Sequence, residues 1–149
     1  TFEIRMQLTQ FTDYSLRALI FIALKQNSCT ISDIAQAYTI SQNHLLKIIH
    51  NLSKLGLIKT TRGRNGGIVM AANPLNINLR TIEEAVEPHF DLVPCFSKEK
   101  ANCCIAPVCK LKTILYEAQN AFLKVLEQFT LADVMHNKSA LNQLLNIQE

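Results

Sequence analysis

The spacing of hydrophobic residues predicts three helices in the first third of the chain. Thr12 is the expected N-cap of the first helix. Thr30 is followed three residues later by an acid, which predicts a short second helix opened by a variant of the capping box. Ser41 is the expected N-cap of the third helix, and Gly56 ends it. A tight turn at residues 39–40 joins the second and third helices, which is the arrangement of a helix-turn-helix.

The pattern changes to two β-prone runs after the third helix. These runs cover residues 57–62 and 67–71, and Gly63-Arg64-Asn65-Gly66 separates them. Asn-Gly favours a hairpin turn because both residues tolerate positive φ. A helix-turn-helix followed by a basic hairpin is a winged helix. We therefore expect a mainly α protein with a winged helix-turn-helix DNA-binding domain whose wing is this β-hairpin.

The second half of the chain predicts a short helix, a loop and a long helix. Thr81 is the expected N-cap of the short helix, with an acid at the third helical position. Residues 88–109 contain three prolines and four cysteines and show no sustained periodicity, which is typical of a functional loop. From Cys109 or Lys110 onward, apolar residues share one face of about five helical turns. Thr130 opens a further short helix, and a last turn or two precede the C-terminus.

The apolar stripe of the long helix is longer than a small winged-helix domain can cover alone, so we expect it to form a homodimer interface. A two-fold protein that reads a palindrome places its recognition helices about 34 Å apart. The expected organisation is a DNA-binding domain at 6–87, a cysteine-rich cluster-binding loop at 88–109, and a dimerisation helix with C-terminal helices at 110–149. Met6 is the expected natural start.

Charge is distributed unevenly along the chain. The formal net charge is +3, yet residues 1–80 hold nine basic and three acidic residues, whereas residues 81–149 hold six and nine. This predicts a polyanion partner, double-stranded DNA, for the first part. No run approaches the roughly 20 apolar residues of a membrane span, and the N-terminus does not resemble a secretory signal. We expect a cytoplasmic protein without a membrane partner. No arrangement of catalytic residues is recognisable, so an enzyme is not expected.

Candidate DNA-reading residues lie in two places. A recognition helix reads the major groove with side chains near its N-terminus, and Gln and Asn amides can pair with adenine. Arg side chains in a glycine-containing wing suit the negative potential of a minor groove. The predicted DNA-binding residues are Ser41, Gln42, Asn43, His44 and Lys47 on the helix, and Arg62, Arg64, Asn65 and Gly66 on the wing.

Four of the five cysteines fall within fifteen residues. In a reducing cytosol such a cluster is more typical of metal binding or redox chemistry than of structural disulfides. Three interpretations remain open on the residues alone: an iron-sulfur cluster, a structural zinc ion, and a switch that uses only thiols. Cys29 lies apart and is expected to be a buried small hydrophobe.

Three stretches resemble a known family: FTDYSLRALI at 11–20, NHLLKII at 43–49 and RGRNGGI at 62–68. They are similar to the IscR-like family of dimeric iron-sulfur winged-helix regulators, and in particular to its nitric-oxide-sensitive repressors. The resemblance implies a [4Fe-4S] or [2Fe-2S] cluster held by Cys95, Cys103 and Cys109. Seven residues separate the first two of these cysteines, more than the four or five expected in relatives. Cys104 is a possible substitute ligand, although spacing favours Cys103.

The resemblance also implies a fourth ligand, Asp13, supplied by the partner subunit. An acid in the first turn of a helix also interacts favourably with the helix dipole and needs no metal to explain it. The implied function is a repressor that binds its operator in the holo form and releases it when nitric oxide nitrosylates the cluster. The alternatives are an IscR-like iron-sulfur or redox-responsive regulator, and a winged-helix regulator with a structural zinc or thiol-only switch.

Overall fold

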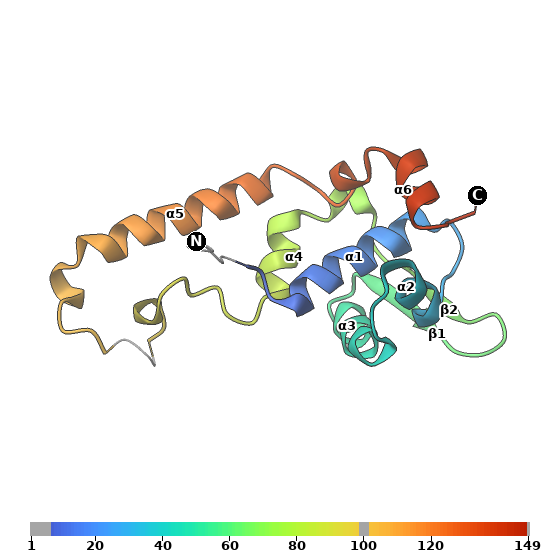
Figure 1. Cartoon of the computed structure of the whole chain (residues 1–149). Helices are drawn as coiled ribbons and strands as arrows, with labels where there is room; N and C mark the ends of the chain where they lie inside the picture. Colours follow the sequence, from blue (N-terminus) through green and yellow to red (C-terminus); the bar gives the residue numbers. More distant parts are fainter. Residues whose placement is uncertain (1–6, 99–101, 149) are drawn as a thin grey trace.

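The computed structural model describes residues 7–98 and 102–148 (Figure 1). Met6 and residues 99–101 of the cysteine loop lie outside this part. Six α-helices and two strands occur in the described part, together with four short 3-10 helices. The helices are α1 (Gln10–Leu24), α2 (Ile31–Tyr38), α3 (Gln42–Lys54), α4 (Leu79–Val86), α5 (Lys110–Glu127) and α6 (Lys138–Leu144), and the strands are β1 (Ile58–Thr61) and β2 (Gly67–Met70).

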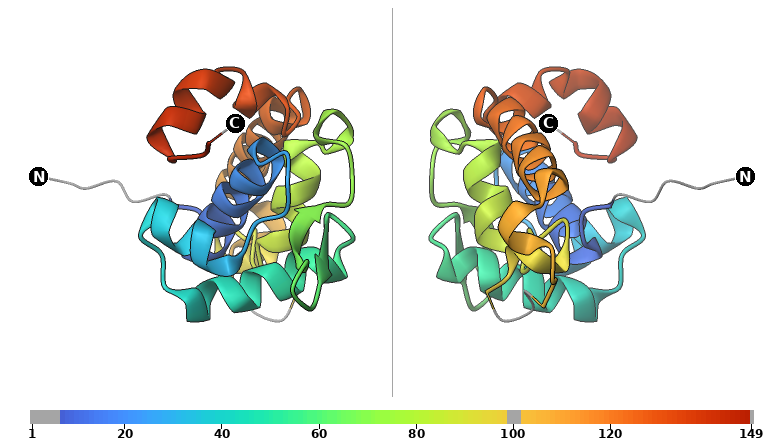
Figure 2. Two further views of the ribbon diagram at one scale, coloured as in Figure 1. Left: turned by 90° about the vertical axis from the view of Figure 1, so that its right-hand side faces the viewer. Right: turned by 90° about the vertical axis from the view of Figure 1, so that its left-hand side faces the viewer.

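Helix α1 lies at the centre of the molecule. Figure 2 shows it between α3 at the lower edge and α6 at the upper edge. Its core face contributes fully buried Ala18, Leu19 and Ile22. The prediction that Thr12 caps this helix is wrong: α1 begins at Gln10, and the side chain of Thr9 accepts the backbone N–H of Thr12 at 3.3 Å. The Thr12 side chain points into the fold instead, where it is fully buried.

The predicted helix-turn-helix is confirmed in α2 and α3. Thr30 and Asp33 form the reciprocal capping box at the start of α2. Thr39 adopts a left-handed conformation with φ of 55°, which ends α2 and turns the chain toward α3. Ser41 caps α3 by accepting the backbone N–H of His44 at 3.3 Å. The buried face of α3 consists of Leu45, Ile48, Ile49 and Leu52.

The predicted wing is confirmed as an antiparallel hairpin of β1 and β2, with Ile58 opposite Met70 and Thr61 opposite Gly67. The expected reason for its turn is wrong, because positive φ occurs at Gly63 (106°) and not at the Asn-Gly pair. Gly66 is needed for another reason: a Cβ there would collide with the backbone carbonyl oxygen of Thr61. The loop before α2 joins this sheet through two backbone hydrogen bonds between Cys29 and Ile68, of 3.0 and 2.7 Å.

Helix α4 connects the winged helix to α5. It begins at Leu79, so the prediction that Thr81 caps it is wrong; Asn78 accepts the backbone N–H of Arg80 at 3.0 Å in that role. The amide of Asn78 also donates to the carbonyl oxygen of Glu127 at 2.7 Å, at the end of α5. Leu79 N–H donates to the carbonyl oxygen of Phe129 at 3.0 Å. The N-terminus of α4 is therefore tied to the C-terminus of α5.

Helix α5 starts where the sequence predicts and extends away from the core along one side of the molecule (Figure 1). Only Leu123 of this helix is buried. Its exposed apolar side chains include Leu111, Ile114, Tyr116 and Val125. Within the described residues, no helix is both long and apolar enough to cross a bilayer.

Candidate nucleic-acid interface and cysteine loop

The exposed face of α3 carries the predicted DNA-reading side chains. Ser41, Gln42, Asn43, His44 and Lys47 are all exposed, because the apolar positions of the helix face α1 and α2. One residue of this face was missed by the sequence reasoning: Leu46 is 55% exposed on the same helix. The sequence signal that could have identified Leu46 is an apolar residue outside the buried stripe of the helix. Such a side chain can make an apolar contact with the methyl group of thymine.

The start of α1 contacts the start of α3. The rings of Tyr14 and His44 lie with centroids 6.1 Å apart, and the amide of Gln10 donates to the hydroxyl of Tyr14 at 2.8 Å. A side chain at the candidate reading position is therefore positioned by the first turns of α1.

The wing presents Arg62, Arg64 and Asn65 to solvent at the tip of the hairpin. No ion pair joins either arginine to another described residue, so both guanidinium groups are available to phosphate. In Figure 1 the hairpin tip and α3 lie along the lower edge of the molecule, and α5 and α6 along the upper edge. The structure thus brings the two predicted groups of DNA-reading residues to one side.

The cysteine loop presents four free thiols. Cys95 lies half-buried in a 3-10 helix (Pro94–Phe96), whereas Cys103 and Cys104 are exposed. Cys109 is half-buried and is the N-cap of α5. Cys29 is buried elsewhere, as expected, and burial raises its pKa to about 11, so it stays a neutral thiol.

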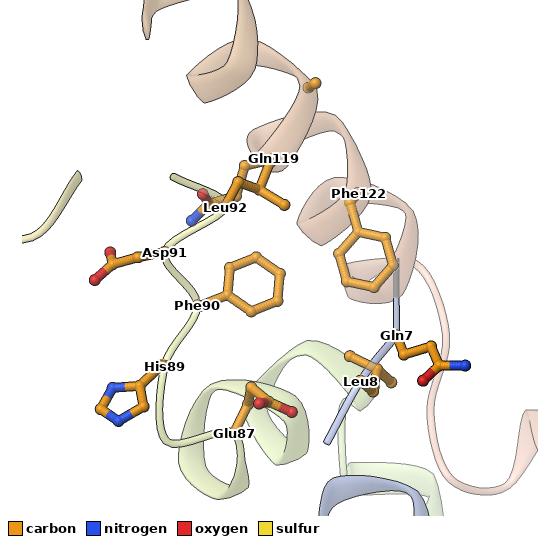
Figure 3. Close-up of a pocket in the computed structure, with 10 residues that line it drawn as sticks. Gln7, Leu8, Glu87, His89, Phe90, Asp91, Leu92, Gln119 and Phe122 are labelled. Carbon is orange, nitrogen blue, oxygen red and sulfur yellow. The ribbon is translucent and has the colours of Figure 1, made fainter. Parts of the chain in front are cut away.

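Aromatic pairs fasten the first half of this loop to α5. The rings of Phe90 and Phe122 stack with centroids 5.7 Å apart, and Phe96 meets Tyr116 edge-on at 6.1 Å. Figure 3 shows Phe90 and Phe122 side by side in the lining of a hollow of about 340 Å³, with Leu8 below them. The loop segment that leads to Cys95 is therefore anchored on the long helix.

The chemistry of these donors fits an iron-sulfur cluster, because accessible thiols on an irregular loop can wrap round an inorganic core. In the single chain, no three Cys, His, Asp or Glu side chains of residues 7–98 and 102–148 surround a common metal position. The structure thus places Cys95, Cys103 and Cys109 on one loop without bringing them into a single ligand group.

Asp13 lies at the surface of α1, where Arg17 holds its carboxylate. The guanidinium donates to both carboxylate oxygens, at 3.2 and 3.1 Å, and also stacks over the Tyr38 ring at 5.9 Å. Both side chains of the ion pair remain almost half exposed. Sequence reasoning missed Arg17, although opposite charges at i,i+4 on a helix are a recognisable signal.

Comparison with known proteins shows extended similarity. The family model Rrf2, described as an iron-dependent transcriptional regulator, matches residues 8–137. The HTH-type transcriptional regulator NsrR of Bacillus licheniformis is 47% identical over 95% of this chain and 100% of its own length. NsrR of Bacillus subtilis is 44% identical over 97% of this chain and 100% of its own length.

Solved structures share the fold. IscR of T. potens superposes with a TM-score of 0.71 at 23% identity, covering 89% of this chain and 88% of its own. CymR of B. subtilis, described as the global cysteine regulator, gives 0.69 at 24% identity, covering 87% and 96%. The winged-helix architecture is therefore confirmed, and a transcriptional regulator rather than an enzyme is confirmed by the relatives. This chain belongs to the Rrf2 family of DNA-binding transcriptional regulators, and regulators named NsrR are its relatives.

Proposed function

We propose that the protein is a homodimeric repressor that senses nitric oxide through an iron-sulfur cluster, [4Fe-4S] or [2Fe-2S]. The protein is cytoplasmic, and its holo dimer binds a palindromic operator in double-stranded DNA. It releases the operator after nitric oxide has reacted with the cluster. The observation that carries this proposal is the group of four free cysteines between the wing and α5. It stands in a chain 44–47% identical to regulators named NsrR.

Three thiols of one subunit would hold the cluster: Cys95, Cys103 and Cys109. Asp13 of the partner subunit would fill the remaining position. To do so, its carboxylate would leave its ion pair with Arg17 and bind iron instead. Bound there, the cluster supplies the iron that reacts with nitric oxide. The boundaries 6–87, 88–109 and 110–149 remain our proposed division of the chain.

The dimer would form along α5. Leu111 is 61% exposed and Ile114 is 51% exposed, so the helix leaves an apolar face without a partner in the single chain. Exposed apolar surface of this kind marks interfaces. A partner on this face would stand beside the cysteine loop, which the aromatic pairs already fasten to α5.

Two routes lead from the cysteine loop to the reading helix. Asp13 is one residue before Tyr14, whose ring contacts His44 on α3. Glu87, at the entrance to the loop, accepts hydrogen bonds from the Thr12 hydroxyl at 2.6 Å and from the backbone and side chain of Thr9 at 3.1 Å each. A change in the loop would therefore shift the first turn of α1 and, through it, the position of His44. Couplings between sites are typically about 1–3 kcal/mol, or roughly 5- to 150-fold in affinity.

The experiment compares operator binding by anaerobically purified protein before and after treatment with nitric oxide. The DNA is the tightest duplex that this holo protein selects from a random pool. We expect holo protein to bind best, and Cys95→Ala, Cys103→Ala and Cys109→Ala to bind like treated protein. Cys104→Ala is the matched control, with iron and sulfide content close to wild type.

Three outcomes would contradict the proposal in different ways. A colourless protein that contains zinc indicates a structural metal site. A metal-free protein whose affinity responds to oxidants indicates a thiol-only switch. Equal operator affinity for holo and cluster-free protein removes the switch and leaves the cluster a structural role.

A further inference from the structure

The carboxyl group of Glu83 is buried without a partner. The residue is 1% exposed, and neither carboxylate oxygen has a hydrogen-bond partner among the described residues. An ionised carboxylate in such a position is costly, because no donor replaces its lost water. Nothing in the proposed nitric-oxide response uses this group.

Among the described residues no cation forms an ion pair with Glu83, the α5 lysines Lys110, Lys112 and Lys124 included. Burial, together with smaller contributions from the carboxylates of Glu87 at the helix C-cap and of Glu84, raises the pKa of Glu83 to about 7. Arg80 is the basic residue of α4, and it pairs at the surface with Glu84 and with Glu127 of α5. On α1, Arg17 is occupied by Asp13, and the buried polar residues are Thr12 and Ser15. The Ser15 hydroxyl donates to the carbonyl oxygen of Phe11 at 2.7 Å.

Helix α4, which carries Glu83, is the connection between α1 and α5. At its C-terminal end, the Glu87 side chain binds Thr9 and Thr12 of α1. At its N-terminal end, Asn78 and Leu79 bind backbone carbonyls at the end of α5 and just after it. Helix α1 in turn packs against α3. A change in the seating of α4 therefore acts on the reading helix and the long helix together.

We propose that Glu83 makes the seating of α4 on α1 depend on a proton, so that the protein binds its operator best when this carboxyl is neutral. The neutral acid fits the apolar contact between the helices, whereas the ionised form favours a loosened α4. Binding to DNA restores the packed arrangement and takes up one proton. Because the packed state itself ionises near pH 7, operator affinity should fall as the pH rises toward about 7 and then level off, by at most about tenfold per pH unit, since one proton is linked to binding.

The test measures operator affinity by fluorescence anisotropy from pH 5 to pH 8, at constant ionic strength and with anaerobic holo protein. Glu83→Met and Glu83→Gln replace the acid by neutral side chains of similar length. Both should lose most of the pH dependence and bind at pH 8 as wild type binds at pH 5. Glu117→Gln is the control, because Glu117 is an exposed acid on α5 that does not contribute to the pKa of Glu83, and it should keep the wild-type profile.

A second readout does not depend on DNA. Amide hydrogen exchange of α4 in the free protein should accelerate between pH 5 and pH 7, beyond the intrinsic rise with pH, in wild type and not in Glu83→Met. An unchanged wild-type affinity across this range would overturn the proposal. The same pH profile in both neutral variants would overturn it too, because the linked proton would then belong to another group.

Discussion

The Sγ atom of Cys109 accepts the backbone N–H of Lys112 at 3.4 Å, so Cys109 is the N-cap of α5. In the proposed regulator Cys109 therefore has two roles: it is a cluster ligand at the end of the cysteine loop, and it caps the dimerisation helix. The N-terminus of a helix favours negative charge, which suits a thiolate at this position.

Substitutions at Cys109 in cluster-free protein should measure its capping role independently of its role as a cluster ligand. In cluster-free protein, Cys109→Ala should lower the free energy of unfolding by about 0.5–2 kcal/mol through the lost cap, whereas Cys109→Ser should keep it. Urea unfolding followed by circular dichroism measures the difference, and Cys104→Ala serves as the unaffected control. Equal destabilisation by the alanine and serine variants would show that the cap contributes nothing.

Asp13 should affect the lifetime of the cluster more than the stability of the fold. Its ion pair with Arg17 is half exposed and spans one helical turn, and such pairs contribute only about 0.3–0.5 kcal/mol. Asp13→Ala should therefore unfold almost as wild type but lose its visible absorption faster in air. Arg17→Ala should have a cluster lifetime at least as long as wild type, because Arg17 and iron compete for one carboxylate. A normal lifetime in Asp13→Ala would remove Asp13 as a ligand.

The wing should contribute to operator affinity mainly through charge. Replacing Arg62 and Arg64 by Ala should weaken binding and reduce the slope of log affinity against log salt by up to about 2, since each lost phosphate contact removes about 0.9. Lys138→Ala is a suitable control, because Lys138 is exposed at the start of α6 on the opposite edge of the molecule. Unchanged affinity across a salt series would show that the wing does not contact DNA.

Charge on the apolar face of α5 should prevent dimerisation. Leu111→Glu combined with Ile114→Glu buries two unpaired carboxylates in the proposed interface, which is unfavourable. Sedimentation at micromolar concentration should find wild type as a dimer and this variant as a monomer. Glu117→Gln, at an exposed polar position of the same helix, should remain dimeric. A monomeric wild-type protein would contradict the proposed interface.

Stability without DNA should depend on pH through Glu83. Its pKa is raised from 4.5 to about 7 by folding, so the folded state holds a proton that the unfolded state releases. The free energy of unfolding should thus fall as the pH rises from about 4.5 to about 7 and then level off. Urea titrations at pH 5, 6, 7 and 8 test this. In a Glu83→Met variant the free energy of unfolding should fall less over this range. A fall equal to that of wild type would show that other titrating groups cause the pH dependence.

Much of this protein is determined by local sequence. The capping box of Thr30 and Asp33, the Ser41 cap and the buried stripe of α3 all depend on residues within a few positions of one another. Such signals act before tertiary contacts form, which is why the helix-turn-helix, the wing and the start of α5 match their predictions. The cysteine loop is equally evident, because no periodic pattern competes with its prolines and thiols.

Contacts between distant residues decided the remainder. The Thr12 hydroxyl donates to Glu87, 75 positions away, so Thr9 and not Thr12 caps α1. Phe90 meets Phe122 only because the loop folds back on α5. Glu83 is an ordinary acid in the sequence, and it becomes a buried, unpartnered carboxyl only where α4 packs between α1 and α5. Local patterns determine which elements form, whereas burial and electrostatics depend on which elements meet.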